Sequence, residues 1–325
     1  MTAYGVQFVS AALTAVLTLG AFAMARAQTY PVKPIRLVLA ISGGGETVAR
    51  TFAQEMSVSL GQAVVVDGQS GAGGAVGAAI VARAAPDGYT LLYASPNSQV
   101  FRLFLVKDVG YDPVRDFTPI ARNVHTPLAI AASADFPVSS LKEFIDYARR
   151  NPGKVSYSTT GIGTGHHLNS EHLKNLTGID FVHVPYKSGP QQMQDLVVGR
   201  IPMAGSILAN FLPHVRAGKV RLLAIIGRDR NPFAPDIPTV REVVPGFESL
   251  EGWSAYFGPA GLPRPIVMRL HAEIARIAEK PEVRATVEKL GYGLNLSTPE
   301  ELEEMVKRDI AHAAKLADKA GVRPE

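Results

Sequence analysis

Short apolar runs alternate with amphipathic helical patterns along most of this chain, and that alternation restricts its fold more than any other feature. The first run, residues 35–40, reads as a buried strand and is followed by glycines and a helical pattern over 46–60. Further strand-like runs follow at 63–67 and 90–94. Strands that alternate with helices of this length form βαβ units. The sequence therefore predicts an α/β fold with mostly parallel sheets flanked by helices.

The alternation restarts after residue 127 and ends before residue 252, which divides the chain. A Pro-rich stretch over 231–238 interrupts it, and 252–258 is aromatic and extended. The helical patterns after residue 264 have no strands of their own and must pack on an earlier sheet. We expect two lobes: residues 28–127 together with 252–325 form lobe 1, and residues 128–251 form lobe 2.

The N-terminal segment has the pattern of an export signal. Residues 1–25 carry no charged side chain and are rich in Ala, Leu, Val and Phe. They lead into Ala25–Arg26–Ala27, a small-x-small cleavage pattern. This predicts a signal peptide over 1–27 that is cleaved after Ala27, and hence export to the periplasm. A basic region before the apolar stretch is missing, so a retained membrane anchor is the alternative.

The composition excludes several function classes. The 325 residues include no Cys, which excludes thiol nucleophiles, cysteine metal sites, disulfides and a lipid anchor on cysteine. Lys and Arg number 33 against 29 Asp and Glu, and a surplus of four is too dilute to indicate nucleic-acid binding. His166, His167 and His172 do not follow a metal-ligand spacing, and no G-x-S-x-G hydrolase motif occurs. We therefore expect no metal, no cofactor and no enzyme activity.

Two glycine loops, each between a strand and a helix, are the strongest binding candidates. One is Ser42–Thr47, and the other is Thr159–Thr164, which is followed by further helix-start residues that include His167. Backbone N–H groups in such a loop and at the helix start attract an anion. Neither loop carries the Gly-Lys-Ser/Thr of a phosphate-binding loop, so a small carboxylate fits better. Plain turns capped by threonine are one alternative, and a hydrolase that pairs His167 with Ser42 or Thr164 is another.

A third glycine run, Gly71–Gly77, has the spacing G-x-G-x-x-x-G and follows a strand. No acidic residue closes the next strand, as a dinucleotide-binding fingerprint requires. We expect these glycines to allow close packing of a helix on a strand.

Several motifs occur in a fixed order from residue 30 to the C-terminal helices. They are Gly71–Gly74, Ala85–Leu92, Tyr111–Phe117, Val182–Lys187, Pro213–Lys219, Pro235–Val240 and Phe257–Gly261. Through their order and spacing the chain resembles the tripartite tricarboxylate transporter receptors, a family of periplasmic solute-binding proteins. The resemblance implies a two-lobed periplasmic-binding-protein fold of type II, with the ligand cleft between the lobes.

The same resemblance implies a function. Such a receptor is a monomer that captures a small mono-, di- or tricarboxylate, aliphatic or aromatic, and hands it to a membrane permease with a large and a small subunit, without catalysis. A sensing module that presents a bound carboxylate to a signalling partner is the alternative that the sequence does not separate from transport.

The resemblance also implies which residues hold the ligand, namely the loop after the first strand, the loop that opens lobe 2, and two side walls. The predicted set is Ser42, Gly43, Gly44, Gly45, Glu46, Ser95, Asn97, Thr160, Gly161, Gly163, Thr164, His167, Ser206 and Asn210. Three positions depart from the family pattern. Glu46 stands where the first loop commonly ends in Thr-Asp, and Pro202 and Ser206 stand where acidic residues are usual. The identity of the carboxylate therefore stays open.

Overall fold

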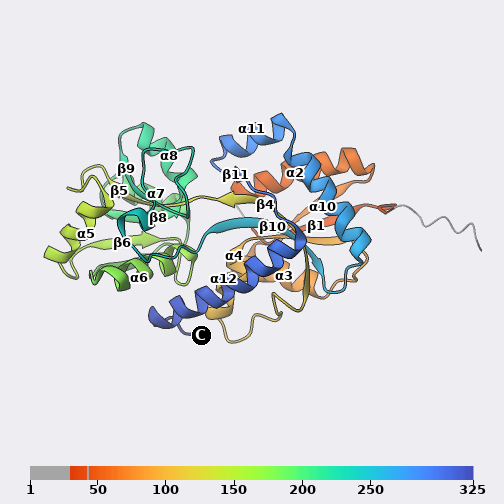
Figure 1. Cartoon of the computed structure of the whole chain (residues 1–325), viewed down its shortest axis with the longest axis horizontal. Helices are drawn as coiled ribbons and strands as arrows, with labels where there is room; N and C mark the ends of the chain where they lie inside the picture. The colour runs from red at the N-terminus through yellow and green to blue at the C-terminus, as the bar shows by residue number, and fades with distance from the viewer. Residues whose placement is uncertain (1–29, 42–43, 325) are drawn as a thin grey trace, which may run out of the picture.

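The computed structural model describes residues 30–41 and 44–324 and shows two α/β lobes side by side, joined by strands that cross between them (Figure 1). The predicted signal peptide at 1–27 and the candidates Ser42 and Gly43 lie outside the described residues. Among the helices that are described, none is long and apolar enough to cross a membrane.

The first sheet, sheet A, has the strand order β11-β4-β10-β3-β1-β2. Its strands are β1 (Ile35–Leu39), β2 (Val64–Gly68), β3 (Thr90–Ala94), β4 (Phe117–Thr126), β10 (Gly252–Pro259) and β11 (Gly293–Leu294). Its helices are α2 (Gly44–Leu60), η1 (Gly71–Gly74), α3 (Ala75–Ala82), α4 (Pro96–Gln99), η2 (Phe101–Phe104), α10 (Arg264–Ala278), α11 (Pro281–Lys289) and α12 (Pro299–Lys319). Apolar residues of α2, α10 and α11 form a core on one face, and those of α3 and α12 form a core on the other.

The second sheet, sheet B, has the strand order β7-β6-β8-β5-β9. Its strands are β5 (Leu128–Ser133), β6 (Ser156–Thr159), β7 (Val182–Pro185), β8 (Met203–Ile207) and β9 (Val220–Ile226). Its helices are α5 (Leu141–Arg150), α6 (Gly165–Thr177), α7 (Gly189–Val197), α8 (Leu208–Arg216) and α9 (Val240–Val243). Helices α5, α6 and α9 contribute to the core on one face, and α7 and α8 to the core on the other.

The predicted α/β class is confirmed with one correction: both sheets are mixed rather than mostly parallel. In sheet A, β1 pairs in parallel with β2 and β3, but β10 pairs antiparallel with β3 and β4. In sheet B, β6 is parallel to β7 and β8, but β5 is antiparallel to β8 and β9. The sheets are mixed because the chain crosses from one sheet to the other and back. Strand β4 leads out of sheet A directly into β5, and β10 returns from sheet B to insert between β3 and β4.

The glycines at 71–77 pack the start of α3 closely against β1, as expected. A Cβ on Gly77 would lie 2.9 Å from the carbonyl oxygen of Gln69 and 3.2 Å from Val38. Gly74 has φ +95° and lies against the backbone of Ala40, so no side chain fits there. These glycines serve helix–strand packing, which is the role that the sequence predicted for them.

The two lobes interlock through α6 and α12. Helix α12 runs along the underside of the molecule in Figure 1 and packs against α6 of the other lobe. Leu168 on α6 is fully buried within the sheet A core formed by α3 and α12. A second contact between the lobes is made by Gly291, which packs on Ala209 of α8. The two are so close that a Cβ on Gly291 would lie 2.7 Å from the Ala209 Cβ. These contacts fix which loops of the two lobes face each other.

Candidate functional site

The predicted site loops follow the carboxyl ends of strands in both sheets. Strand β1 ends before the first loop, and β3 ends before Ser95. Strand β6 ends before the second loop, and Ser206 is the next-to-last residue of β8. The carboxyl ends of parallel strands meet at one edge of a sheet, where α/β proteins bind ligands. One direct contact joins the two edges: Gly163 of the second loop lies against Leu105, so closely that a Cβ would overlap that side chain.

The first loop leads into α2, which begins with Gly44 and Gly45. A Cβ on Gly44 would lie 2.8 Å from the Tyr292 hydroxyl oxygen, so glycine makes room for this ring. Burial raises the pKa of Tyr292 to about 12. A neutral phenol therefore lies against the first turn of α2. The amides of Glu46 and Thr47 are the next donors of this helix end.

Glu46 does not turn back toward these amides. Its Oε1 accepts hydrogen bonds from Arg50 Nε at 3.0 Å and Arg50 Nη2 at 2.8 Å, one helical turn further on. The pair is partly exposed, and it holds the acid along the helix surface. Glu46 therefore lies at the mouth of the loop with its charge matched by Arg50.

A group of buried polar side chains from the crossing strands lies beneath the first loop. The Tyr93 hydroxyl donates to Asn123 Oδ1 at 3.2 Å, and Ser254 Oγ lies 3.9 Å from the position of a Cβ on Gly45. Asn123 Nδ2, Ser254 Oγ and the Tyr256 hydroxyl are buried and have no protein partner among the described residues. Buried polar atoms without partners are rare and costly, so they point to a polar binding site. Sequence reasoning missed Asn123 and Ser254.

The second loop is held in one conformation by its own hydrogen bonds. Gly161 and Gly163 have φ of +136° and +69°, which favours glycine. The Thr164 hydroxyl donates to the Gly161 carbonyl at 2.9 Å and accepts the His167 N–H at 3.4 Å, so it caps α6. The capped turn that the sequence left as an alternative is therefore present. Thr160 lies beside it, half-buried.

His167 completes this loop from the first turn of α6. Its Nδ1 accepts the Gly163 N–H at 3.0 Å, so the neutral ring carries its proton on Nε2. Burial lowers the pKa of His167 to about 4. The imidazole stacks on His183, whose Nε2 lies 2.7 Å from the Thr159 hydroxyl. His183 therefore belongs to the packing of sheet B. His167 presents an uncharged N–H donor.

The predicted side walls differ from each other. Ser95 is buried at the start of α4, whereas Asn97 is exposed. Gln99 on the same short helix is fully buried, and both atoms of its side-chain amide have no protein partner within the described chain. In lobe 2, Asn210 Nδ2 donates to Ser206 Oγ at 3.0 Å. The structure thus brings Ser206 and Asn210 together and adds Gln99 beside Ser95.

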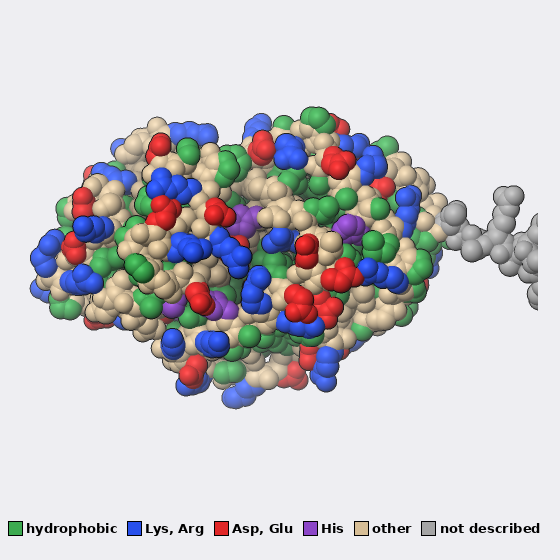
Figure 2. Space-filling view, in the orientation of Figure 1, with side chains coloured by type: hydrophobic (Ala, Val, Ile, Leu, Met, Phe, Trp, Pro, Cys, Tyr) green, Lys and Arg blue, Asp and Glu red, His purple; other side chains and the backbone are tan. Residues whose placement is uncertain are grey.

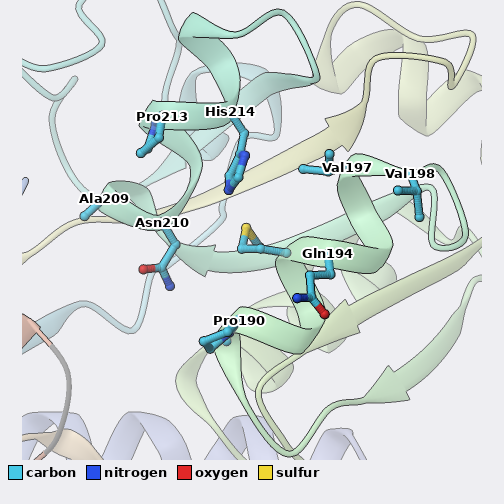
Figure 3. Close-up of a pocket in the computed structure, with 10 residues that line it drawn as sticks. Pro190, Gln194, Val197, Val198, Ala209, Asn210, Pro213 and His214 are labelled. Carbon is cyan, nitrogen blue, oxygen red and sulfur yellow. The ribbon is translucent and has the colours of Figure 1, made fainter.

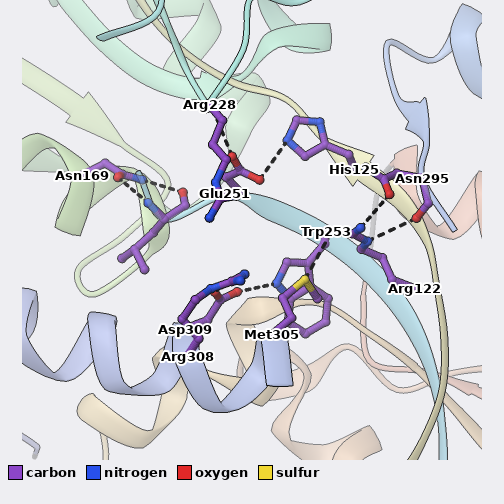
Figure 4. Close-up of polar contacts among 11 residues, drawn as sticks. Arg122, His125, Asn169, Arg228, Glu251, Trp253, Asn295, Met305, Arg308 and Asp309 are labelled. Atoms are coloured by element: carbon purple, nitrogen blue, oxygen red, sulfur yellow. Dashed lines mark hydrogen bonds and ion pairs between the residues drawn. The ribbon is translucent and has the colours of Figure 1, made fainter. Parts of the chain in front are cut away.

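Where the chain crosses between the lobes, polar contacts tie strands to helices (Figure 4). Glu251 accepts the Arg228 N–H at 3.1 Å and lies 3.8 Å from His125 Nε2. The Asn169 amide makes two bonds to the Leu250 backbone, at 2.8 and 2.9 Å. Trp253 Nε1 donates to Asp309 Oδ2 at 2.9 Å. These contacts hold the crossing strand β10 against helices of both lobes.

Over residues 30–41 and 44–324, no group of three or more His, Cys, Asp or Glu side chains is arranged to hold a metal ion. The surface in Figure 2 carries positive and negative side chains side by side over both lobes.

Comparisons with known proteins show the family to which the chain is similar. Residues 48–322 match the model of the tripartite tricarboxylate transporter family receptor. A UPF0065 protein from the tcbD–tcbE intergenic region of Pseudomonas sp. strain P51 is 34% identical over 316 residues, covering 96% of this chain and 94% of that protein.

Two solved structures of similar proteins contain bound ligands. The first is Rpa4515 of R. palustris with adipate, with a TM-score of 0.81 and 30% identity over 91% of this chain and all (100%) of that one. The second is MatC of Rhodopseudomonas palustris with bound malate, with a TM-score of 0.75 and 31% identity over 88% of this chain and 99% of that one. The chain belongs to the tripartite tricarboxylate transporter receptor family of periplasmic solute-binding proteins.

Proposed function

We propose that this protein is an exported periplasmic receptor that captures a small carboxylate between its lobes and delivers it to a membrane permease with a large and a small subunit. The observation that carries the proposal is the pair of glycine loops at the sheet edges of the two lobes. Beneath one of them lie buried polar groups that have no protein partner among the residues the structure describes. The adipate and malate bound to the two similar proteins support a carboxylate as the ligand class.

In this proposal the carboxylate is held mainly by neutral donors. The first-turn amides of α2 and the Nε2–H of His167 approach it from opposite lobes. Hydrogen bonds from preorganised amides to a carboxylate are charge-assisted and strong without a cationic side chain. The proposed ligand-binding residues are those predicted from the sequence, together with Gln99, Asn123, Ser254 and Tyr292.

We propose that ligand binding favours the closed arrangement of two lobes, residues 28–127 with 252–325 and residues 128–251. A ligand that touches both lobes binds the closed form better and shifts the population toward it. The crossing strands β4 and β10 are the natural place for this motion. The predicted signal segment at 1–27 supports export, and the closed form is the one that a permease would recognise.

No catalytic step is part of this proposal. His167 is uncharged at neutral pH, and its Nδ1 is occupied by the Gly163 amide. The Thr164 hydroxyl is engaged on both sides by its own loop. A histidine and a hydroxyl committed in this way serve a binding loop better than an acid–base pair.

Calorimetry on the purified mature chain tests the proposal, with adipate, malate, succinate and citrate as ligands and a sugar and an amine as controls. We expect at least one acid to bind, to raise the melting temperature and to remain chemically unchanged. Tight binding of the sugar or the amine with no response to any acid would overturn the proposal. Turnover that disappears in His167→Ala would establish the hydrolase instead. Uptake of the bound acid by cells that lack the gene tests delivery to a permease.

A further inference from the structure

A groove of about 580 Å³ runs between α7 and α8 on one face of sheet B (Figure 3). Its lining is mostly apolar, with Met193, Val197, Val198 and Pro213 among the lining residues. Gln194 and His214 add polar atoms at its sides. Val198 is 62% exposed there, so its side chain is free to contact a ligand in the groove.

One end of this groove is also a wall of the proposed carboxylate site. Asn210, one of the predicted ligand-binding residues, lines the groove, and a Cβ on Gly189 would lie 3.5 Å from its Nδ2. Figure 3 shows Ala209 and Asn210 at one end of the groove and Val198 at the opposite end.

The same end lies close to the first glycine loop of the other lobe. Ala209 lines the groove and packs on Gly291. The next residue, Tyr292, lies against Gly44 at the start of α2. The groove therefore begins where the two lobes meet and leads away from the amides that would hold a carboxylate.

The size and chemistry of the groove define what fits. From Pro190 to Val197 it follows α7 for roughly 10 Å, at 1.5 Å per residue. Its volume lies in the range of pockets that bury whole small-molecule ligands, roughly 300–1,000 Å³. A short dicarboxylate held at the glycine loops would not enter it, and a second carboxylate would lose its hydration against methionine and valine. An alkyl or aryl group would bury apolar surface there.

We infer that this receptor takes carboxylates with a bulky apolar tail, whose carboxylate is held at the glycine loops and whose tail lies in the groove between α7 and α8. The inference rests on the proposed function, because it assigns the substrate class of the same site. Asn210 marks the junction between head and tail. Val198 is the far boundary of the tail site.

Three acids with the same six-carbon chain test this assignment by calorimetry: hexanoate, adipate and 6-phenylhexanoate. We expect 6-phenylhexanoate to bind the wild-type protein at least about tenfold more tightly than hexanoate, because its ring adds buried apolar area. Equal affinities, or exclusion of the phenyl compound while adipate binds, would overturn the tail site and leave the proposed function in place. If neither these acids nor malate and citrate bind, the proposed function itself fails.

A matched pair of variants locates the tail. Val198→Glu places a charge at the far end of the groove, and Val58→Glu makes the same change at a 77% exposed position on α2. We expect Val198→Glu to weaken 6-phenylhexanoate by about fivefold or more while hexanoate changes less than about twofold, and Val58→Glu to leave both unchanged. An equal response of the two variants would overturn the inference.

A photoreactive diazirine on the phenyl ring gives a second measurement on wild-type protein. Labelled peptides should come from α7 and α8, and labelling confined to other segments would also overturn it.

Discussion

The imidazole of His167 stacks on that of His183, with ring centroids 4.1 Å apart and planes 19° apart. The ring of Tyr157 also stacks on His183, at 4.9 Å. Burial lowers the pKa of both imidazoles to about 4. Both rings are therefore neutral at pH 7, and their stack joins the start of α6 to β7, the edge strand of sheet B.

This stack predicts a loss of stability in mild acid. The folded-state pKa of about 4 lies below the reference value of 6.5 for both histidines, so the unfolded chain binds protons first as the pH falls. Their contribution to stability is complete above about pH 6.5 and decreases progressively toward pH 4. Thermal unfolding followed by circular dichroism between pH 7.5 and 4 should show the melting temperature falling over this interval.

His183→Phe separates the stack from other acid effects. Phenylalanine keeps a ring on His167 but removes one titrating group and the bond to the Thr159 hydroxyl, so we expect a loss of about 1 kcal/mol at pH 7. Its melting temperature should then depend less on pH than that of the wild type. His214→Phe on α8 removes a histidine outside the stack. An identical acid profile in His183→Phe and in His214→Phe would show that the stack is not responsible.

Gly163 should be far less replaceable than a glycine with the same backbone conformation elsewhere. Gly163 and Gly178 have φ of +69° and +64°, but only Gly163 has a neighbour, Leu105, where a Cβ would stand. Gly178→Ala should cost about 1 kcal/mol from its backbone alone. Gly163→Ala should cost roughly 1–3 kcal/mol more, because Leu105 must move. It should also weaken carboxylate binding by about tenfold, because the displaced loop carries the amides.

Urea unfolding and calorimetry on the two alanine variants measure both effects. Small-angle scattering adds a readout of lobe separation, since Gly163 lies at a contact between the lobes. We expect a larger radius of gyration for Gly163→Ala than for Gly178→Ala. Equal stability and equal affinity of the two variants would mean that the Leu105 contact has no role.

Much of the fold was predictable because its signals are local. The helix predicted over 46–60 is α2, and the strand predicted over 90–94 is β3 with the same bounds. Strand β4 was missed because Arg122, Asn123 and His125 interrupt its apolar pattern. These polar side chains are compensated by long-range partners: Arg122, for example, donates to Asn295 Oδ1 at 2.6 Å. No local sequence pattern predicts a partner so distant in sequence.

The candidate site likewise has parts with a local sequence signal and parts that depend on long-range contacts. Glycine loops could be recognised because strand, glycine and helix are neighbours in sequence. The polar group of Asn123 and Ser254 could not, because it forms only when β10 returns to pair with β4. Gln99 gave no signal either, since a glutamine in a short helix is unremarkable until its burial is known.

Neutralising Glu46 should strengthen the binding of anions. Its carboxylate lies at the mouth of the first loop and is only partly exposed, paired with Arg50. Glu46→Gln removes a negative charge beside the proposed carboxylate position, and we expect affinity for adipate to rise about two- to fivefold at low salt. The exposed i,i+4 pair contributes about 0.3–0.5 kcal/mol, so stability should change little.

Glu303→Gln is the matched control for that charge. Glu303 forms the same kind of i,i+4 pair, with Lys307 at 2.7 Å, on α12. It should leave affinity unchanged in calorimetric titrations at two salt concentrations. A rise in affinity for both variants would indicate a general effect of net charge, and a fall for Glu46→Gln would mean that the Glu46 side chain, and not only its amide, contacts the ligand.

The contact between Trp253 and Asp309 should govern how firmly α12 is held on the crossing strand. Trp253 is the single tryptophan of the chain, and its buried Nε1–H donates to Asp309 Oδ2 at 2.9 Å. Asp309→Leu leaves this donor without its partner and should cost about 1–3 kcal/mol. Burial raises the pKa of Asp309, so the fold disfavours its charge. Asp309→Asn keeps an acceptor without the charge and should be at least as stable as the wild type at pH 7.

Urea unfolding monitored by tryptophan fluorescence measures the relative stabilities of these variants directly, because Trp253, the single tryptophan of the chain, reports on its own environment. Asp309→Leu should unfold at lower urea than the wild type, and its native emission should change because the indole has lost its acceptor. Lys315→Ala, at an exposed position on the same helix, should leave both the midpoint and the emission unchanged. If Asp309→Asn were as unstable as Asp309→Leu, the negative charge rather than the hydrogen bond would be holding α12 in place.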